Sequence, residues 1–300
     1  MLLERLLPLL GSFRNQVVLV TGASSGIGRE TALTFARQGA SVALAARRRE
    51  QLEETAAAVT DAGGRALVVP TDVSDPQAAH AAVAEVRRKW KRLDILVNNA
   101  GILRPSAVTE LTAEDLNEML RVNLFGALFM MQAALAVMER QPGGGTIINV
   151  ASLAGRRGVT PLGGYCATKF ALVGLTEALR TELGGSKIHV GLVLPGVVDT
   201  PMAQGFNENA LLQTWPSLLN MPVEWVAVSV LLAVRFRLRE VSVPPGAATM
   251  ELLGALVPTM TDTLIRWSTA AGRLLARSTG GGATTSRPPA AKRRPTTRRT

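Results

Sequence analysis

The residues best suited to chemistry are a tyrosine and a lysine in one short segment. Tyr165 is the only tyrosine of the 300-residue chain, and Lys169 follows four positions later. If residues 161–184 form a helix, these two side chains share one face. An ammonium about 4 Å from a phenol, at an effective dielectric of about 20, favours the phenolate by roughly 4 kcal/mol. We therefore expect Lys169 to bring the pKa of Tyr165 down towards neutral pH, where a general acid–base is most useful. The alternative is a half-buried tyrosine beside a solvated lysine.

A second pattern, near the amino terminus, is typical of a diphosphate-binding turn. The apolar run Gln16–Thr21 predicts a buried strand, a glycine-rich turn follows, and a helical stretch continues from Arg29. Gly22 would permit a tight turn, Gly26 a close approach of phosphates, and Gly28 close packing of helix on strand. The spacing G-x-x-x-G-x-G departs from the generic G-x-G-x-x-G, so an ordinary loop is the alternative.

Further short motifs accompany these two patterns along the chain. The set consists of T-G-x-x-x-G-x-G at Thr21–Gly28, N-N-A-G at Asn98–Gly101, a serine at Ser152, Y-x-x-x-K at Tyr165–Lys169 and P-G at Pro195–Gly196. In order and spacing they resemble the short-chain dehydrogenases/reductases, over about residues 14–246. The resemblance implies a catalytic set in which Ser152 also binds the substrate: Asn123, Ser152, Tyr165 and Lys169.

The resemblance also implies a nicotinamide dinucleotide cofactor. The residues expected to bind it lie in the glycine turn, after strand ends and on the catalytic helix: Thr21, Gly22, Ser24, Ser25, Gly26, Ile27, Gly28, Arg47, Asp72, Val73, Asn99, Tyr165, Lys169, Val198 and Thr200. After the second predicted strand, Ala46 stands where a carboxylate would bind a free ribose 2′-hydroxyl. Arg47 instead suits a 2′-phosphate, which indicates NADP(H). A solvated, basic helix start is the alternative interpretation of Arg47–Arg49.

Strand and helix patterns alternate along the chain. The predicted strands are Val17–Val20, Ser41–Ala45, Ala66–Val69, Ile95–Val97, Thr146–Val150, Ile188–Leu194 and Val241–Val243. Helical patterns separate them, the longest at about Thr112–Arg140. The alternation predicts an α/β domain with a doubly wound, Rossmann-like parallel sheet, whose ligand site lies at the carboxyl ends of the strands.

Composition divides the chain into four expected segments. They are an apolar leader at residues 1–13, the catalytic domain at 14–246 with a lid at about 200–221, a helical extension at 247–278, and a disordered basic tail at 279–300. The tail carries six of the positive charges behind the net charge of +10 and no acidic residue. Neither Met1–Leu10 nor Val223–Phe236 is long enough to span a membrane. The extension could pack on the protein, form a subunit interface or lie on a membrane surface, which the tail would assist.

Other chemistries find little support in the sequence. One cysteine, Cys166, excludes an internal disulfide and fits a reducing compartment, so we expect a cytoplasmic protein that could touch the membrane periphery. The two histidines, His80 and His189, lack metal-ligand spacing, and we expect neither a metal site nor a Ser-His-Asp hydrolase. Apart from the tail, nothing indicates nucleic-acid recognition.

The sequence thus predicts an NADP(H)-dependent oxidoreductase that interconverts a small-molecule carbonyl and an alcohol. Apolar residues of the lid, among them Met202, Phe206 and Trp215, favour an apolar ketone or aldehyde, although they could equally form the lid's own core. The alternatives are a 3-oxoacyl-carrier-protein reductase and a catalytically silent NADPH-binding scaffold. We expect a homodimer or homotetramer that pairs through the helix at about Asn117–Arg140 and the helix of Tyr165, as is common in the family.

Overall fold

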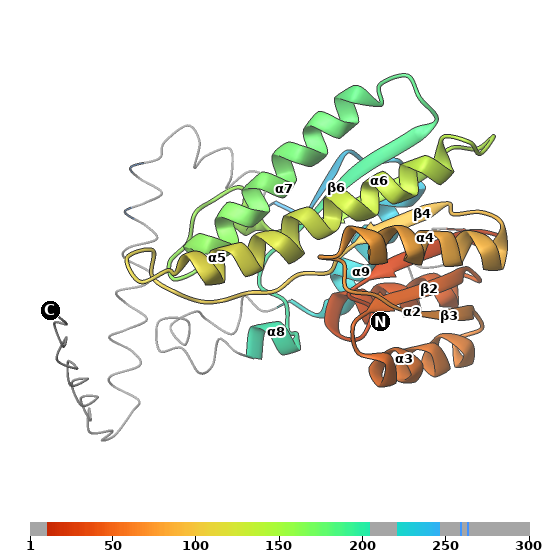
Figure 1. Cartoon of the computed structure of the whole chain (residues 1–300), viewed down its shortest axis with the longest axis horizontal. Coiled ribbons are helices and arrows are strands. Elements are labelled where there is room, and N and C mark those ends of the chain that lie inside the picture. The colour runs from red at the N-terminus through yellow and green to blue at the C-terminus, as the bar shows by residue number, and fades with distance from the viewer. Residues whose placement is uncertain (1–10, 205–220, 247–258, 260–262, 264–300) are drawn as a thin grey trace, which may run out of the picture.

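The computed structural model describes residues 11–204 and 221–246, together with Thr259 and Thr263. These residues form one seven-stranded sheet between two layers of helices (Figure 1). Most of the predicted leader and lid, and nearly all of the predicted extension and tail, lie outside the described residues.

All neighbouring strands of the sheet are parallel, in the order β3-β2-β1-β4-β5-β6-β7. The strands are β1 (Val17–Thr21), β2 (Ser41–Ala46), β3 (Arg65–Pro70), β4 (Ile95–Asn98), β5 (Gly145–Val150), β6 (Ile188–Pro195) and β7 (Glu240–Val243). The doubly wound sheet is confirmed, and each predicted strand bound is within one residue of the observed one. β1, β4 and β6 are buried along their whole length, because helices cover both faces, and such strands read as continuous apolar runs.

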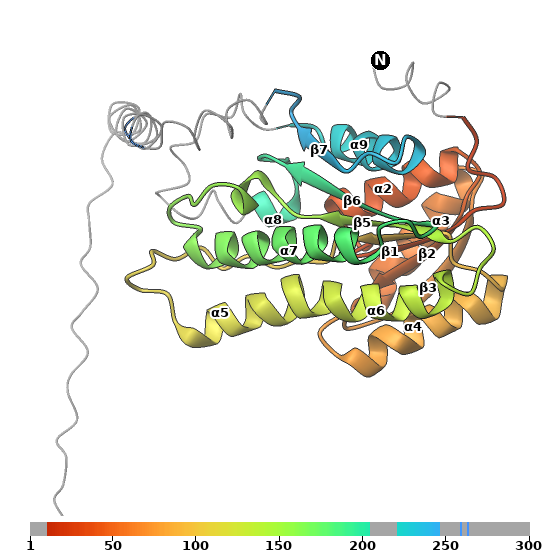
Figure 2. The ribbon, with the colours of Figure 1, turned by 90° about the horizontal axis from the view of Figure 1, so that it is seen from above.

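Two helical layers sandwich the sheet (Figure 2). One layer contains α2 (Gly26–Arg37), α3 (Arg49–Asp61) and α9 (Val223–Arg235), and the other contains α4 (Pro76–Trp90), α6 (Gly126–Met138) and α7 (Gly163–Glu182). The shorter elements are α5 (Ala113–Leu120), the 3-10 turn η3 (Leu153–Gly155) and α8 (Pro201–Gln204). A parallel sheet places every strand start at one edge and every strand end at the other. The loops after the strand ends, where the predicted site residues lie, therefore share one edge.

The predicted long helix at Thr112–Arg140 is interrupted by one π-helical turn. Between α5 and α6, residues Arg121–Phe125 form the π-helix η2, which contains Asn123. Together these elements make Ala113–Met138 the one helix of the described residues that is long and apolar enough to cross a membrane. Met130 and Met131 are buried in the core beneath it, as in a helix that covers a sheet. Pairing of two chains through this helix and α7 stays a prediction.

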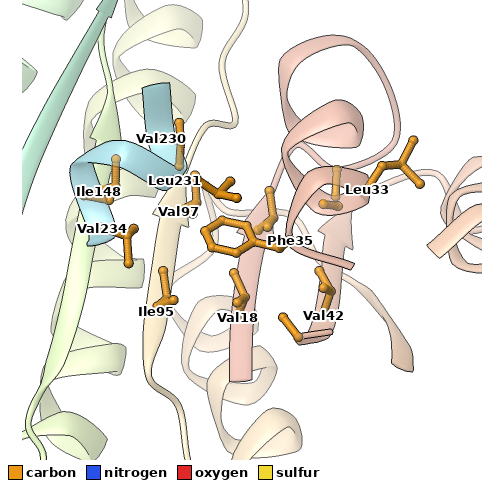
Figure 3. Close-up of a cluster of buried hydrophobic side chains, with 14 of the residues drawn as sticks. Val18, Leu33, Phe35, Val42, Ile95, Val97, Ile148, Val230, Leu231 and Val234 are labelled. Carbon is orange, nitrogen blue, oxygen red and sulfur yellow. The ribbon is translucent and has the colours of Figure 1, made fainter. Parts of the chain in front are cut away.

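The larger core lies between the sheet and the layer of α2 and α9. Phe35 of α2 is fully buried among Val18, Ile95, Leu231 and other aliphatic side chains (Figure 3). Phe13 meets the Phe35 ring edge-on, with centroids 5.1 Å apart and planes at 89°. The folded domain therefore uses Phe13 in its core, one residue before the predicted domain boundary. This core fixes α2, whose first turn borders the candidate site.

Truncation of this aromatic tests how far α2 depends on the core. We expect Phe35→Ala to lower the free energy of unfolding by about 3–5 kcal/mol, because it removes a fully buried ring and leaves a cavity. Phe236→Ala is the matched control, since Phe236 is 57% exposed, and it should change stability by less than about 1 kcal/mol. Urea unfolding followed by circular dichroism measures both. Equal losses for the two variants would contradict the assigned core.

Candidate active site

A cavity of about 310 Å³ opens at the carboxyl edge of the sheet, over β1, β2, β4 and β5. It runs from the loop after β2 to the catalytic helix α7. Its lining includes twelve of the predicted site residues: Gly22, Ser24, Ser25, Gly26, Ile27, Arg47, Asp72, Val73, Asn99, Tyr165, Lys169 and Thr200. Sequence reasoning from two distant patterns, the glycine turn and the Tyr-Lys pair, therefore led to one cavity.

The glycine turn has a backbone that other residues would not easily adopt. Gly22 and Gly26 have φ angles of +66° and +52°, in the left-handed region that favours glycine. The turn leads into α2, whose N-cap residue Ser25 makes no side-chain capping hydrogen bond. Because the first N–H groups of a helix have no partner within it, the start of α2 offers donors and a positive dipole end to an anion.

Thr21 and Asn99 join the two loops that form the floor of the cavity. The Thr21 hydroxyl accepts hydrogen bonds from the backbone N–H groups of Asn99 and Ala100, at 2.9 and 3.0 Å. The Asn99 side-chain amide donates to the Thr21 carbonyl at 3.0 Å. A Cβ on Gly28 would lie 2.3 Å from the Gly22 carbonyl oxygen and 2.5 Å from Asn99 Nδ2, so only glycine fits there. Thr21 and Gly28 thus shape the cavity without lining it.

Basic side chains surround the far end of the cavity. Ala46 ends β2, and the exposed residues Arg47 and Arg48 follow it in the lining. The carboxylate of Asp72 accepts hydrogen bonds from the N–H and hydroxyl of Ser74, at 3.0 and 2.8 Å. Burial opposes ionisation of Asp72, but these bonds, with Arg47 and Arg121, hold its pKa below the ordinary value. The carboxylate of Asp72 is thereby already hydrogen-bonded, whereas the exposed lining residue Arg47 forms no ion pair among the described residues.

Tyr165 and Lys169 lie on the cavity side of α7, as the i, i+4 spacing predicted. The Lys169 ammonium is 5.6 Å from the centre of the Tyr165 ring and donates to the Val150 carbonyl at 3.1 Å. Ser152 stands between β5 and η3, where its hydroxyl donates to the Pro195 carbonyl at 3.2 Å and accepts from Ala154 N–H at 3.1 Å. Ser152 is also close enough to Tyr165 to affect the pKa of its hydroxyl. The predicted serine, tyrosine and lysine are therefore neighbours.

The predicted lowering of the Tyr165 pKa is wrong, because the surroundings that the protein provides raise this pKa instead. Burial raises the pKa of Tyr165 well above its ordinary value, although the neighbouring Ser152 hydroxyl works against this rise. Burial likewise lowers the pKa of Lys169 to about 8. The helical spacing correctly put the ammonium beside the phenol, but both groups pay a desolvation cost that the spacing does not reveal. The protein's own groups therefore favour the protonated phenol at Tyr165.

Asn123 is fixed by its side chain and does not line the cavity. Its Oδ1 accepts from Ile102 N–H at 2.7 Å, and its Nδ2 donates to the Ile102 carbonyl at 2.9 Å and to Thr168 Oγ1 at 3.0 Å. Both amide hydrogens are thus used. The π-helical turn η2 brings this residue to the loop after β4 and to α7. Asn123 therefore links the lining residues Ala100–Ile102 to the helix of Tyr165 and Lys169.

The remaining residues divide into predicted ones outside the lining and lining residues that were missed. Val198 is buried in the core and borders the cavity only through its neighbour Thr200. Several lining residues in the loops after strands were given no binding role from the sequence, although two of them, Ala100 and Gly101, belong to the N-N-A-G motif: Thr71, Ala100, Gly101, Ile102 and Ala151. Their position after a predicted strand could have indicated that they line the site. Apart from Thr71, their small or apolar side chains carry no functional group that suggests a binding role. Cys166 is buried and exchanges weak hydrogen bonds with Val159.

The lowered pKa of Lys169 predicts a pH-dependent stability. Below about pH 8 the lysine is protonated in both folded and unfolded chains, and the fold bears the full cost of a buried ammonium. Between about pH 8 and 10 the folded chain releases the proton that the unfolded chain keeps, so stability rises with pH, by at most roughly 1.4 kcal/mol per unit.

Lys169→Met removes this titration, and its stability advantage over the wild type should shrink across the same window. Urea unfolding at several pH values measures both proteins. A constant difference between them would show that Lys169 has an ordinary pKa.

Comparison with known proteins agrees with this geometry. The family profile described as "short chain dehydrogenase" matches residues 16–211. The sorbitol dehydrogenase of Cereibacter sphaeroides is 41% identical over 61% of this chain and 71% of its own length. The 3beta-hydroxysteroid dehydrogenase of Mediterraneibacter gnavus is 38% identical over 65% of this chain and 71% of its own.

Solved structures show the same fold. A short chain dehydrogenase/reductase from Burkholderia phymatum, in complex with NAD, superposes with a TM-score of 0.73 at 25% identity, covering 81% of this chain and 93% of its own. An alcohol dehydrogenase from Thermococcus sibiricus, complexed with 5-hydroxy-NADP, gives 0.68 at 27% identity, covering 76% and 95%. The chain belongs to the short-chain dehydrogenase family, whose members are oxidoreductases that bind nicotinamide cofactors and act on alcohols or carbonyls.

Proposed function

We propose that this protein is an NADPH-dependent reductase of apolar ketones or aldehydes. The observation that carries the proposal is the one cavity that joins Arg47 at one end to Tyr165 and Lys169 at the other, with Ser152 beside Tyr165 just outside the lining. The open N–H groups at the start of α2, the left-handed glycines and the guanidinium of Arg47 fit a phosphorylated dinucleotide. When bound, NADPH supplies the hydride of the reaction.

Three side chains of the site handle the substrate oxygen and its proton. Tyr165, kept protonated by burial, donates its proton to the oxygen of the reduced carbonyl. Ser152 keeps its place through the bond from Ala154 N–H, while its hydroxyl hydrogen turns from the Pro195 carbonyl to the same oxygen and stabilises the developing charge. Lys169, with a pKa of about 8, is poised to return a proton towards Tyr165 near neutral pH. Asn123 acts as a positioning residue, because both hydrogens of its amide are used within the fold.

The surroundings of Tyr165 support an apolar substrate. Leu162 and Cys166 are buried beside it, with Leu103, Ala154 and Val159 packed against them. At this end the lining continues with Ile102 and Met202, and Lys169 is its only charged side chain among the described residues. A polar or charged substrate would lose hydration here without gaining partners. The steroid dehydrogenase among the relatives is named for a substrate of this apolar kind.

The proton-donor role of Tyr165 predicts a clean separation of effects. Tyr165→Phe removes only the hydroxyl, so turnover with NADPH should fall by about 10²–10⁴-fold, which is the usual contribution of general acid–base catalysis. NADPH affinity should stay within a few-fold. Steady-state kinetics on an apolar ketone and a fluorescence titration of NADPH measure the two quantities. Retention of more than about a tenth of the turnover would exclude Tyr165 as the proton donor.

The cofactor preference rests on Arg47. Charge-assisted hydrogen bonds contribute about 1.5–3 kcal/mol, so Arg47→Ala should weaken NADPH binding by roughly 10- to 150-fold and leave NADH binding unchanged. Arg49→Ala is the matched control: Arg49 starts α3, pairs with Glu53 at 3.6 Å and does not line the cavity. Binding titrations with both cofactors decide. A wild-type protein that binds NADH as tightly as NADPH would overturn the NADP(H) assignment.

A further inference from the structure

A short turn at the opposite edge of the sheet alternates basic and apolar residues. It connects α9 to β7 with the sequence Arg235-Phe236-Arg237-Leu238-Arg239. All five side chains are exposed, Phe236 by 57% and Leu238 by 37%. This turn is remote from the cavity, because it precedes the start of β7 whereas the cavity lies over strand ends. The proposed reaction has no use for it.

The backbone of the turn is fixed, so its side chains are presented in a defined arrangement. Phe236 ends α9, Leu238 N–H donates to the Ala233 carbonyl at 3.0 Å, and Arg237 has a φ of +49°. This is a helix-ending motif in which glycine normally occupies the left-handed position. The Leu238 carbonyl bonds His189 Nε2 at 3.0 Å, and the Arg239 carbonyl accepts from Arg180 at 2.8 Å. The fold thus keeps an arginine at a position where glycine would be easier.

Neighbouring segments extend the positive charge of this turn. The Arg235 guanidinium lies beside Gly11, where the described chain enters the fold, and the stem of Arg14 packs against Gly39 nearby. Arg237 donates to the Lys187 carbonyl at 3.3 Å, which brings that lysine alongside. Among the described residues, none of the cations Arg14, Lys187, Arg235, Arg237 and Arg239 has a carboxylate within ion-pairing distance.

The positive charges of the turn also affect the buried imidazole of His189 beneath it. His189 lies under Leu238, and its pKa is lowered, first by burial and then by Arg237, Arg180 and Arg239. Glu240, the acidic residue next to Arg239, is turned to Arg156 on the other side, at 2.5 Å. Five cations therefore surround two exposed apolar side chains with little local compensation.

We propose that these residues, which we call the amino-edge patch (Arg14, Lys187 and Arg235–Arg239), bind the surface of an anionic lipid bilayer. Basic side chains near such a surface gain about 1 kcal/mol each, and Phe236 and Leu238 can enter the headgroup region. The residues that precede Gly11 in sequence, Met1–Leu10, are largely apolar, so the chain enters the fold at this face with further apolar sequence attached. Exposed aliphatic and aromatic side chains suit lipid better than a nucleic-acid backbone, which would need polar contacts in their place.

This surface differs from the extension and basic tail that sequence composition pointed to. β7 ends at Val243, and the described chain continues to Gly246 at the carboxyl edge of the sheet. The amino-edge patch lies at the opposite edge. A bilayer bound to the patch leaves the cavity facing away from it. Binding at the patch should therefore localise the protein without covering the site.

Co-sedimentation of the full chain with lipid vesicles tests the proposal. We expect binding to phosphatidylcholine vesicles that contain about one-third phosphatidylglycerol, and little binding to phosphatidylcholine alone. The combined variant Arg235→Gln, Arg237→Gly, Arg239→Gln should lower the partition coefficient by about 100-fold. Glycine suits the left-handed position of Arg237, so this variant keeps the turn.

A matched control removes three cations from the other helical layer. Arg87→Gln, Lys89→Gln, Lys91→Gly alters the end of α4, where Lys91 has a φ of +64° and glycine again fits. It should reduce binding by no more than about threefold. Phe236→Ser should weaken binding about tenfold or more, and Phe236→Trp should restore it, because tryptophan suits the membrane interface.

Three results would overturn the proposal. They are equal losses in the two triple variants, no loss in Phe236→Ser, and no sedimentation of the wild type with anionic vesicles. Fluorescence anisotropy with a DNA duplex tests nucleic acid as the alternative partner. The patch would be a nucleic-acid surface if the wild type bound the duplex tightly but not the vesicles, and if only the triple variant of Arg235, Arg237 and Arg239 lost duplex binding. Melting temperatures confirm that each variant is folded. None of these measurements depends on the proposed reductase activity.

Discussion

The parallel sheet, covered by helices on both faces, is the constraint on which the rest of this structure depends. An unpaired polar group is costly within strands that are buried on both sides, so functional polar residues gather at the edges of the sheet. At the carboxyl edge, loops from β1, β2, β4 and β5 surround one cavity. At the amino edge, the parallel strands all begin together, so the basic residues that precede them, such as Lys187 and Arg239, lie close to one another. The two edges thus present two different chemistries.

Inside the sheet, a few buried hydrogen bonds fix the catalytic helix against the strands. Asn98 Nδ2 donates to Asn149 Oδ1 on the neighbouring strand, and Asn149 Nδ2 donates to Thr176 of α7, each at 2.9 Å. Asn123 ties α7 to the loop after β4 from the other side. A loss of any of these bonds would leave a buried amide unpaired, so they hold α7 in one position. These hydrogen bonds therefore also fix the positions of Tyr165 and Lys169 on α7.

Much of this arrangement could be predicted from the sequence, for physical reasons that are specific to it. Buried parallel strands are continuous apolar runs, and residues such as Thr21, Asn99 and Ser152 directly follow them. The π-helical turn at Asn123 was missed because its partners, Ile102 and Thr168, are distant in the chain. The pKa direction of Tyr165 was wrong because spacing along a helix reveals the neighbour but not the burial. Phe236 belongs to the apolar stretch Val223–Phe236, and only the structure shows that its side chain is exposed.

In the proposed reaction burial keeps Tyr165 a protonated phenol, and the positive charge of an oxidised nicotinamide would favour the phenolate once this cofactor is bound. Because the chain has one tyrosine, the ultraviolet absorbance of phenolate reports on Tyr165 alone. A pH titration of the folded protein should give a midpoint above the ordinary value of about 10, and saturating NADP⁺ should move that midpoint down. A midpoint at or below about 10 in the protein alone, or one that NADP⁺ does not move, would contradict the account.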